Sequence, residues 1–484
     1  MAGARVAVVG GGVAGLTAAH RLRRELGPEA DIVVLDQADR LGGKLRTVEL
    51  AGCGYDLGAE AFLARRPEVP RLAAELGLTD ELVNPSSASA ALRAGGARTR
   101  LPAEAVMGIP ASAESARHVL SEAGVRAMHA ESALEPLRME GADVSVGRLL
   151  RERVGDEVVE RLVEPLLGGV YAGTADALGL RATVPSLAAA LDAGAESITA
   201  AVRAALPTPA PDQQSKPPVF GAFRSGYRTL IDRLSERSSA RVRLGLPVRS
   251  LERSDGGWRL RVGSATGAEL LDVDAVVLAV PAPSARRLLS DVVPAAAEGM
   301  GTVELASTVV VGMALPPGTE LPDASGVLVA RGETHSDGTP FTAKAFTLSD
   351  RKWPHLRGSG GEVLLRASVG RGDAAELRVD DDELLRRVRA DLAELTGVRA
   401  EPVDTAVARW GGGLPQYGVG HLDTVAGIEE AVAGVPGLAL AGATLHGVGV
   451  PACVATGEAA ATEITDHLLA RGPVRGGKLG AWRA

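Results

Sequence analysis

The hydrophobic positions at the start of the chain change from a strand pattern to a helical pattern and back. Arg5–Val9 is a short apolar run with β-branched residues. Val13–Leu26 carries apolar residues at helical spacing and stops at Gly27-Pro28, a common helix end. Ile32–Asp36 is a second apolar run. The pattern predicts a strand, a glycine turn, a helix and a second strand, which together form one βαβ unit.

Helical spacing dominates from about residue 110 to residue 206, and strand patterns return after the proline-rich stretch 207–218. The last elements are a buried strand at 438–441, a glycine, and a helix from about 451 to 469. Further predicted elements are helices at 144–153, 157–167, 187–206 and 380–395, and strands at 242–246, 258–262, 275–280, 307–313, 327–330, 342–348 and 363–369.

Both ends of the chain therefore resemble parts of a nucleotide-binding fold, whereas the middle does not. The predicted class is α/β, with a discontinuous Rossmann-like dinucleotide-binding domain, an α+β substrate domain and a helical insertion. The expected ranges are 1–85, 216–300 and 405–472 for the dinucleotide-binding domain, 86–110 and 301–404 for the substrate domain, 111–206 for the helical domain and 207–215 for a linker.

Composition narrows the functional classes. With 484 residues the chain is too long for one hydrophobic core, and its net charge of -8 argues against nucleic-acid binding. Cys53 and Cys453 have no metal-ligand spacing, so we expect no metal site and a reducing compartment. No apolar run reaches the roughly 18 residues that a membrane span requires. We expect a cytoplasmic protein, and peripheral contact with the inner face of the membrane stays open.

The segment Gly10–Gly15 satisfies the G-x-G-x-x-G pattern, and each glycine has a mechanical reason. Gly10 makes the tight turn after the strand, Gly12 lets a pyrophosphate approach the backbone, and Gly15 lets the helix pack closely on the sheet. The N-terminus of the helix then offers free N–H groups to phosphate. Asp36 follows at the distance expected for a carboxylate that accepts a ribose 2′-OH. The pattern predicts an adenine dinucleotide but leaves the choice between FAD and NAD open.

Two further segments favour FAD. Asp39–Lys44 and Gly54–Glu60 carry glycines that allow the main chain to run along a bound cofactor, and an NAD-only domain does not need them. Near the other terminus, Gly447–Pro451 leads into the last predicted helix. That helix N-terminus, directed at the flavin N1/C2=O region, would stabilise an anionic reduced flavin.

With these motifs the chain resembles the amine oxidase–like flavoproteins, and within them the protoporphyrinogen/coproporphyrinogen oxidase family. The matching stretches occur in the family's order along nearly the whole chain, and the soluble Gram-positive and actinobacterial branch is the most similar. The segments that carry the resemblance are Val6–Gly15, Asp36–Lys44, Gly58–Phe62, Pro165–Gly173, Gly221–Leu230, Trp410–His421 and Ala441–Gly457. Pro415-Gln416-Tyr417 with Gly420-His421, and the Gly-Val-Tyr-Ala-Gly stretch, are the most specific.

The motifs and the resemblance together predict non-covalent FAD contacts along the two glycine-bearing laps, the adenine strand and the C-terminal loop. The expected residues are Gly10, Gly11, Gly12, Val13, Ala14, Gly15, Asp36, Gln37, Arg40, Gly42, Gly43, Lys44, Gly58, Ala59, Glu60, Val248, Trp410, Gly442, Val448, Gly449 and Val450. One departure stands out. Ala443 follows Gly442 where many other flavoproteins carry an acid that holds the ribityl chain, so a backbone contact is expected to do that work.

The resemblance implies oxidation of a porphyrinogen in haem synthesis, with O₂ as electron acceptor and H₂O₂ as product. Coproporphyrinogen III is the expected substrate, and protoporphyrinogen IX is the alternative that the FAD motifs do not separate from it. Substrate carboxylates require cationic side chains. The candidates for the substrate pocket are Arg65, Arg66, Tyr171, Gly173 and Lys344, and no catalytic base is assigned.

Two other functions stay open at this point. The first is another enzyme of the same fold, an amine oxidase or a carotenoid desaturase, although an aromatic content of 3% is low for an amine oxidase. The second is a protein that keeps FAD without catalysis. Transient contact with ferrochelatase also stays open.

Overall fold

The computed structural model describes residues 3–207, 218–264, 266–372 and 376–471. Strands from both ends and the middle of the chain form one parallel sheet, in the order β12 (Arg241–Arg243), β2 (Asp31–Leu35), β1 (Arg5–Val9), β16 (Ala275–Leu278) and β22 (Leu438–Leu440). The dinucleotide-binding domain is therefore discontinuous, with α/β architecture.

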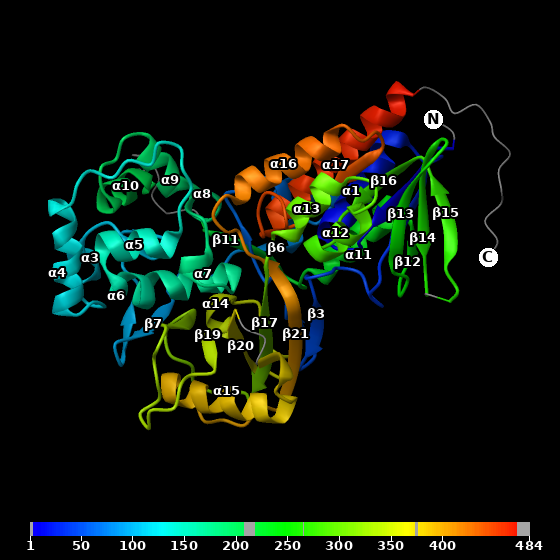
Figure 1. Ribbon diagram of the computed structural model, residues 1–484. Coiled ribbons are helices and arrows are strands. Elements are labelled where there is room, and N and C mark those ends of the chain that lie inside the picture. The colour runs from blue at the N-terminus through cyan, green and yellow to red at the C-terminus, as the bar shows by residue number, and fades with distance from the viewer. Residues whose placement is uncertain (1–2, 208–217, 265, 373–375, 472–484) are drawn as a thin grey trace.

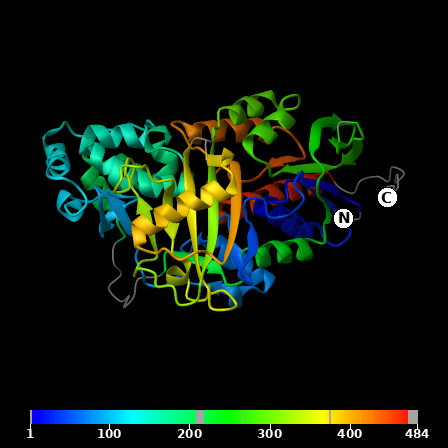
Figure 2. The ribbon, with the colours of Figure 1, turned by 90° about the horizontal axis from the view of Figure 1, so that it is seen from below.

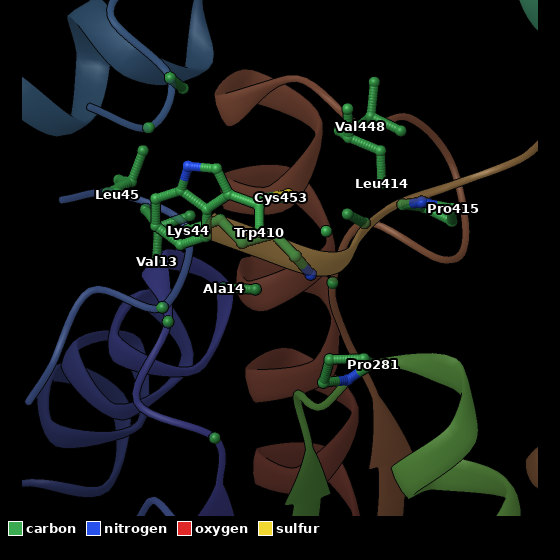
Figure 3. A pocket seen from close by; sticks show the side chains of 18 of the residues that line it. Val13, Ala14, Lys44, Leu45, Pro281, Trp410, Leu414, Pro415, Val448 and Cys453 are labelled. Carbon is green, nitrogen blue, oxygen red and sulfur yellow. The ribbon is translucent and has the colours of Figure 1, made fainter. Parts of the chain in front are cut away.

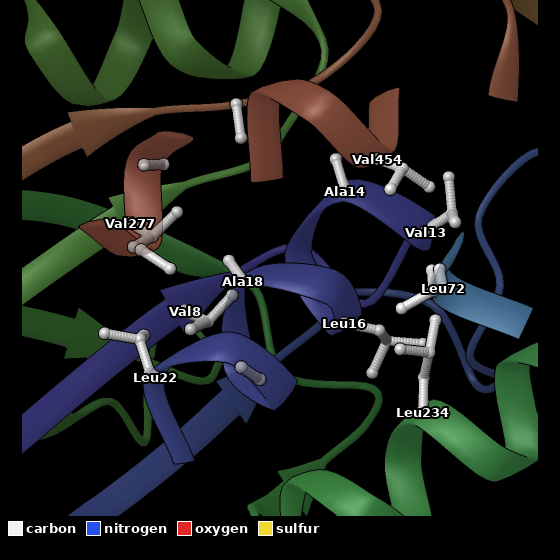
Figure 4. Close-up of a cluster of buried hydrophobic side chains, with 14 of the residues drawn as sticks. Val8, Val13, Ala14, Leu16, Ala18, Leu22, Leu72, Leu234, Val277 and Val454 are labelled. Carbon is white, nitrogen blue, oxygen red and sulfur yellow. The ribbon is translucent and has the colours of Figure 1, made fainter. Parts of the chain in front are cut away.

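The alternation along β1 explains why helices cover both faces of this sheet. Val6 and Val8 belong to one buried cluster, whereas Ala7 and Val9 belong to another on the opposite face. On the first face, α1 (Val13–Leu26) packs between α17 (Val450–Ala470) and α11 (Arg228–Ser238), and Figure 4 shows Leu16, Ala18 and Leu22 of α1 in this cluster.

The opposite face is covered by a second layer. It contains the antiparallel strands β13 (Val248–Ser254), β14 (Gly257–Val262) and β15 (Glu269–Val273), and the helices α12 (Ala282–Leu289), α13 (Pro294–Gly301) and α16 (His421–Ala433). The smaller elements of this part of the chain are β3 (Thr47–Leu50), β4 (Cys53–Asp56), β5 (Phe62–Leu63), α2 (Glu68–Leu76), η1 (Thr79–Glu81), β6 (Leu82–Val83) and β11 (Phe220–Phe223).

The second large sheet is mixed and comes from the middle of the chain. Its order is β21 (Asp404–Pro415), β17 (Leu305–Leu315), β20 (Val363–Gly372), β19 (Ala343–Thr347), β18 (Gly326–Val329), β7 (Ala91–Ala94) and β8 (Ala97–Arg100). The amphipathic helix α15 (Asp381–Thr396) crosses one face, as Figure 2 shows, and buries Leu384, Val388 and Leu392 against it. The short elements α14 (Ser349–Lys352) and η5 (Glu376–Arg378) lie beside this sheet.

The helical part projects at one end of the molecule (Figure 1). It comprises β9 (Ala105–Val106), β10 (Ile109–Pro110), α3 (Ala113–Ala116), α4 (Glu122–Ala130), η2 (Glu131–Ala133), α5 (Val146–Val154), α6 (Asp156–Val158), a π-helical turn Val159–Val163, α7 (Glu164–Tyr171), η4 (Ala175–Ala177), α8 (Leu180–Thr183), α9 (Pro185–Asp192) and α10 (Ile198–Ala205). The single helix expected at 187–206 is two helices. Gly194 has φ +99 and Ser197 caps α10 by accepting from Ala200 N, so the apolar run continues while the helix does not.

One expected domain boundary also differs. Residues from 405 onwards were assigned to the dinucleotide-binding domain, but β21 pairs with β17 from Leu305 to Ala314 and so belongs to the mixed sheet. Apart from residue 207, the expected linker 207–215 lies outside the described residues. Among the described helices, none has the length and apolar character needed to cross a bilayer.

Candidate functional site

A cavity of about 590 Å³ lies between the carboxyl ends of the parallel strands and the inner face of the mixed sheet. Val9 and Leu35 line it from β1 and β2, and Thr308 and Ser368 line it from β17 and β20. Figure 3 shows Val13, Lys44 and Leu45 on one wall and Leu414, Pro415 and Val448 on another. Two sheets and the loop before α17 therefore enclose one site.

The glycine turn forms the inner wall through close packing of backbone. Gly10 has φ +112, and a Cβ on Gly15 would lie 1.9 Å from Gly10 O. By contrast, a Cβ on Gly12 would meet nothing nearer than Gly43 Cα at 4.0 Å, so this position opens into the cavity. Gly12 is the N-cap of α1 and no side chain caps that helix. Its first N–H groups are free for an anion such as a pyrophosphate.

The Asp36 carboxylate is held in place by two backbone N–H groups. Its Oδ2 accepts from Gly11 N at 2.6 Å and its Oδ1 accepts from Ala38 N at 2.8 Å, and the residue lines the cavity together with Gln37. Each carboxylate oxygen retains a lone pair that can accept from a hydroxyl group. Val248, at the start of β13, lines the same end.

The segment Asp39–Lys44, which follows β2, contains two cationic residues with different roles. Arg40 does not line the cavity. It donates to Gly43 O at 2.7 Å, to Leu41 O at 3.1 Å and to Leu45 O at 3.2 Å, and it holds the turn in shape. Lys44 lines the cavity, and burial lowers the pKa of its amine. In the described ranges no carboxylate forms an ion pair with Lys44, so the amine could pair with the negative charge of a bound cofactor.

In the second glycine-containing segment, Gly54–Glu60, Gly58 and Ala59 line the cavity, whereas Glu60 does not. The Glu60 carboxylate lies 3.0 Å from Arg366 Nε and pairs with Lys352, and Arg366 itself donates to Gly58 O at 3.0 Å. Burial alone would raise the pKa of Glu60, but Arg366 and Lys352 outweigh it and lower the pKa to about 2. Glu60 is therefore an ionised anchor behind the lap.

The loop 442–449 and the start of α17 form the wall opposite the glycine turn. Gly442, Val448, Gly449 and Val450 all line the cavity, and no side chain caps α17 at Gly449. A second helix N-terminus is thus available to negative charge. The Ala443 carbonyl, at the position of the missing acid, accepts from the Tyr417 hydroxyl at 2.6 Å.

The outer end of the cavity is mainly apolar, with one buried amine and with Arg366 from β20. Leu305, Leu414 and Val170 line it, and Lys344 reaches it from β19 with only 6% of its surface exposed. Lys344 Nζ donates to Gly168 O at 3.1 Å. Of the substrate candidates, this is the one that the structure brings to the cavity.

The other substrate candidates do not line the cavity. Arg65 is exposed, and Arg66 forms an ion pair with Glu68 at the start of α2. Tyr171 is buried against Tyr417, with ring centroids 5.7 Å apart. A Cβ on Gly173 would lie 1.8 Å from Gln416 Oε1, so this glycine makes room for Gln416. The neighbouring Gly169 and Val170 are the lining residues instead.

Several lining residues carry no local sequence signal. Arg366 and Ser368 alternate along β20, and Arg287 on α12 donates to Val248 O at 3.2 Å. Strand alternation predicts that Arg366 and Ser368 share one face of the sheet, but it does not predict that this face lines the cavity. Other cavity residues absent from the expected set include Ala61, Ser284, Thr308, Pro415, Thr444 and Cys453. No cluster of metal-ligating side chains occurs among the described residues.

A parallel sheet with a glycine turn, an oriented ribose carboxylate and two uncapped helix N-termini at one cavity defines an adenine-dinucleotide-binding α/β protein. The family model described as flavin containing amine oxidoreductase matches residues 13–465. The chain belongs to this family, in its protoporphyrinogen/coproporphyrinogen oxidase branch, and its cofactor is FAD. The predicted fold class and cofactor are confirmed.

Relatives and solved structures support this assignment. A coproporphyrinogen III oxidase of Mycobacterium tuberculosis is 46% identical over 466 residues, covering 96% of this chain and 98% of the relative. One of Bacillus subtilis is 31% identical, with coverage of 96% and 98%. A crystal structure from Exiguobacterium, described as a protoporphyrinogen oxidase, superposes with a TM-score of 0.82 at 32% identity, covering 96% of this chain and 98% of that one.

Proposed function

We propose that the chain is an FAD-dependent oxidase that converts coproporphyrinogen III to coproporphyrin III in haem biosynthesis. The relatives named coproporphyrinogen III oxidase support it, since they match 96% of the chain. The observation that carries it is the outer end of the FAD cavity, where an apolar lining surrounds one buried amine, Lys344. A large, mainly apolar tetrapyrrole ring that carries carboxylates fits such a lining. The cytoplasmic location and O₂ as electron acceptor are parts of the same proposal.

The residues that would hold FAD follow from the cavity. The uncapped start of α1 and Lys44 would bind the pyrophosphate, Asp36 the ribose, and the uncapped start of α17 the flavin end. When bound, FAD would accept a hydride from a meso carbon of the substrate and would then pass two electrons to O₂, which gives H₂O₂. Full oxidation of the porphyrinogen removes six electrons and therefore takes three such rounds.

The protein's own contribution is binding, orientation and exclusion of water. Lys344, whose amine donates to Gly168 O at 3.1 Å, holds one substrate carboxylate at this end of the cavity. Leu305, Leu414 and Val170 surround the ring and keep water from the reacting carbon. No carboxylate or imidazole of the described residues lines this end, and no side chain is assigned as a base for the pyrrole protons.

Protoporphyrinogen IX is the second candidate substrate. A chloroplastic protoporphyrinogen oxidase of Oryza sativa is 28% identical over 495 residues, and it covers 96% of this chain and 90% of the relative. The two substrates differ in their number of carboxylates, four in coproporphyrinogen and two in protoporphyrinogen. Arg366 also lines the cavity but pairs with Glu60, so Lys344 is the cation that we assign to a carboxylate of either substrate.

Anaerobic mixing of the yellow holoprotein with each porphyrinogen tests the proposal. Coproporphyrinogen III is expected to bleach the flavin within the mixing experiment, and admission of air should restore the yellow colour with porphyrin fluorescence and H₂O₂. Faster bleaching by protoporphyrinogen IX would reverse the order of the two substrates. Retention of the oxidised flavin spectrum with both would refute the proposed oxidase activity.

A further inference from the structure

The segment that leaves β21 carries two side chains that lie behind the cavity wall. Leu414 and Pro415 line the cavity, but Gln416 and Tyr417 do not. The Tyr417 hydroxyl donates to Ala443 O at 2.6 Å and accepts from Gly447 N at 2.8 Å. One oxygen atom therefore joins both ends of the turn that precedes α17.

His421 reinforces the same contact from the first turn of α16. Its ring stacks on Tyr417 with centroids 3.8 Å apart and an interplanar angle of 14°. Its Nε2 lies 3.2 Å from Leu445 O, in the middle of the turn. Burial lowers the pKa of His421, which favours the neutral imidazole, and the Nε2–H tautomer donates to this carbonyl.

The turn needs such support from outside. Gly442 and Gly447 have φ +118 and +140, and both are residues that lose much conformational entropy on folding. Residues on both sides of the turn, 442–444 and 448–450, line the FAD cavity. A shift of the turn would therefore move the N-terminus of α17 relative to the cofactor.

We propose that Tyr417, assisted by His421, is a positioning residue that fixes the turn 443–447 and so holds the N-terminus of α17 against FAD. Tyr417 takes over the support of Ala443, a residue with no side-chain oxygen of its own. The inference depends on the FAD cofactor and not on which porphyrinogen is oxidised, so it can fail or hold independently of the proposed function.

The test is the thermodynamic cycle of FAD binding and FAD reduction in Tyr417→Phe. The variant keeps the ring stack and loses two hydrogen bonds, so oxidised FAD is expected to bind about ten-fold more weakly. Reduced FAD should weaken further, because the helix N-terminus stabilises the added negative charge. Each additional ten-fold corresponds to a fall of about 30 mV in the two-electron reduction potential. Dissociation constants and potentials measured separately must agree.

Two variants make the result decisive. Tyr227→Phe removes a buried hydroxyl that has no partner among the described residues and does not line the cavity, and it should leave both quantities unchanged. His421→Phe retains an aromatic ring, loses one hydrogen bond and should shift both quantities in the same direction by a smaller factor. It also stands in if Tyr417→Phe fails to fold. Wild-type FAD affinity and potential in both Tyr417→Phe and His421→Phe, whatever their melting temperatures, would overturn the proposal.

Discussion

The two ends of the cavity are built in different ways. The dinucleotide end is made largely of backbone, with glycines, N–H groups and one carboxylate held by two N–H donors. The outer end is made of side chains from β17, β19, β20, β21 and α7, which lie far apart in the sequence. A backbone site tolerates little change at its own residues, whereas a side-chain site can change specificity one residue at a time.

The largest effect is expected at the glycine turn. Gly15→Ala should destabilise the protein by about 3 kcal/mol and abolish FAD binding, because its Cβ would lie 1.9 Å from Gly10 O. Gly12→Ala adds a Cβ that has room in the protein itself, so the apoprotein should stay as stable while FAD binds about a hundred-fold more weakly, which is about 2.7 kcal/mol. Denaturation of the apoproteins and FAD titration measure the two quantities. Equal losses of stability would contradict the distinction between packing and ligand space.

The next effect concerns the ion pairs that Glu60 forms with Arg366 and Lys352. Glu60→Gln leaves Arg366 and Lys352 without their carboxylate and should lower the free energy of unfolding by about 3 kcal/mol at pH 7. The pKa of about 2 in the folded state lies below the ordinary 4.5. The wild-type contribution is therefore complete above pH 4.5 and is lost as the pH falls towards 2. Denaturant titrations of both proteins across this range should converge at low pH, and a constant difference would contradict the ion-pair account.

At the outer end, Lys344→Met should raise the KM for the porphyrinogen by about ten-fold to a hundred-fold, the worth of one charge-assisted hydrogen bond. FAD affinity should stay the same, since the glycine turn and Lys44 are untouched. Arg65→Gln is the matched control, because Arg65 is exposed and does not line the cavity. A larger increase in KM for Arg65→Gln than for Lys344→Met would contradict this assignment and would indicate that the substrate binds at the turn after β5.

The smallest effect is expected at Gln416, which donates to Tyr171 O at 2.6 Å and so holds the end of α7 beside the cavity. Gln416→Met should weaken binding of the product coproporphyrin III by about five-fold, because it removes roughly one neutral hydrogen bond. The affinity for FAD should stay within about two-fold of the wild-type value. Product titration followed through the flavin spectrum gives both numbers. A loss confined to FAD binding would show that Gln416 serves the dinucleotide end instead.

The sequence alone predicts the dinucleotide end well because its signals are local. Gly10, Gly12 and Gly15 follow a strand and open a helix, and their spacing translates directly into geometry. Asp36 also lies where the second strand predicts it, at the cavity. Glu60 and Arg40 show the limit of such local prediction. Both lie in the predicted segments, but Glu60 forms an ion pair with Arg366 and Arg40 donates to a backbone carbonyl, and only the folded chain reveals these partners.

The outer end could not be predicted in the same way. Arg366 lies at the cavity because β20 pairs with β17 and β19, and a strand pattern does not say which face meets a cofactor. The nearness of Arg65 and Arg66 in sequence to Gly58–Phe62 makes them candidates, but β5 pairs with β11 and leads the chain away to α2. Tyr171 and Gly173 were expected in the correct segment, one turn from the lining residues Gly169 and Val170.

The order of strands in the parallel sheet has a consequence for how the cofactor is acquired during synthesis. β1 leaves the ribosome hundreds of residues before its neighbour β16 and the sheet's last strand β22, and α17 is the last described helix. A nascent chain therefore carries its glycine turn for most of translation without the helix that completes the opposite wall. We therefore expect FAD capture to occur late in synthesis, and a chain that stops before α17 should emerge colourless.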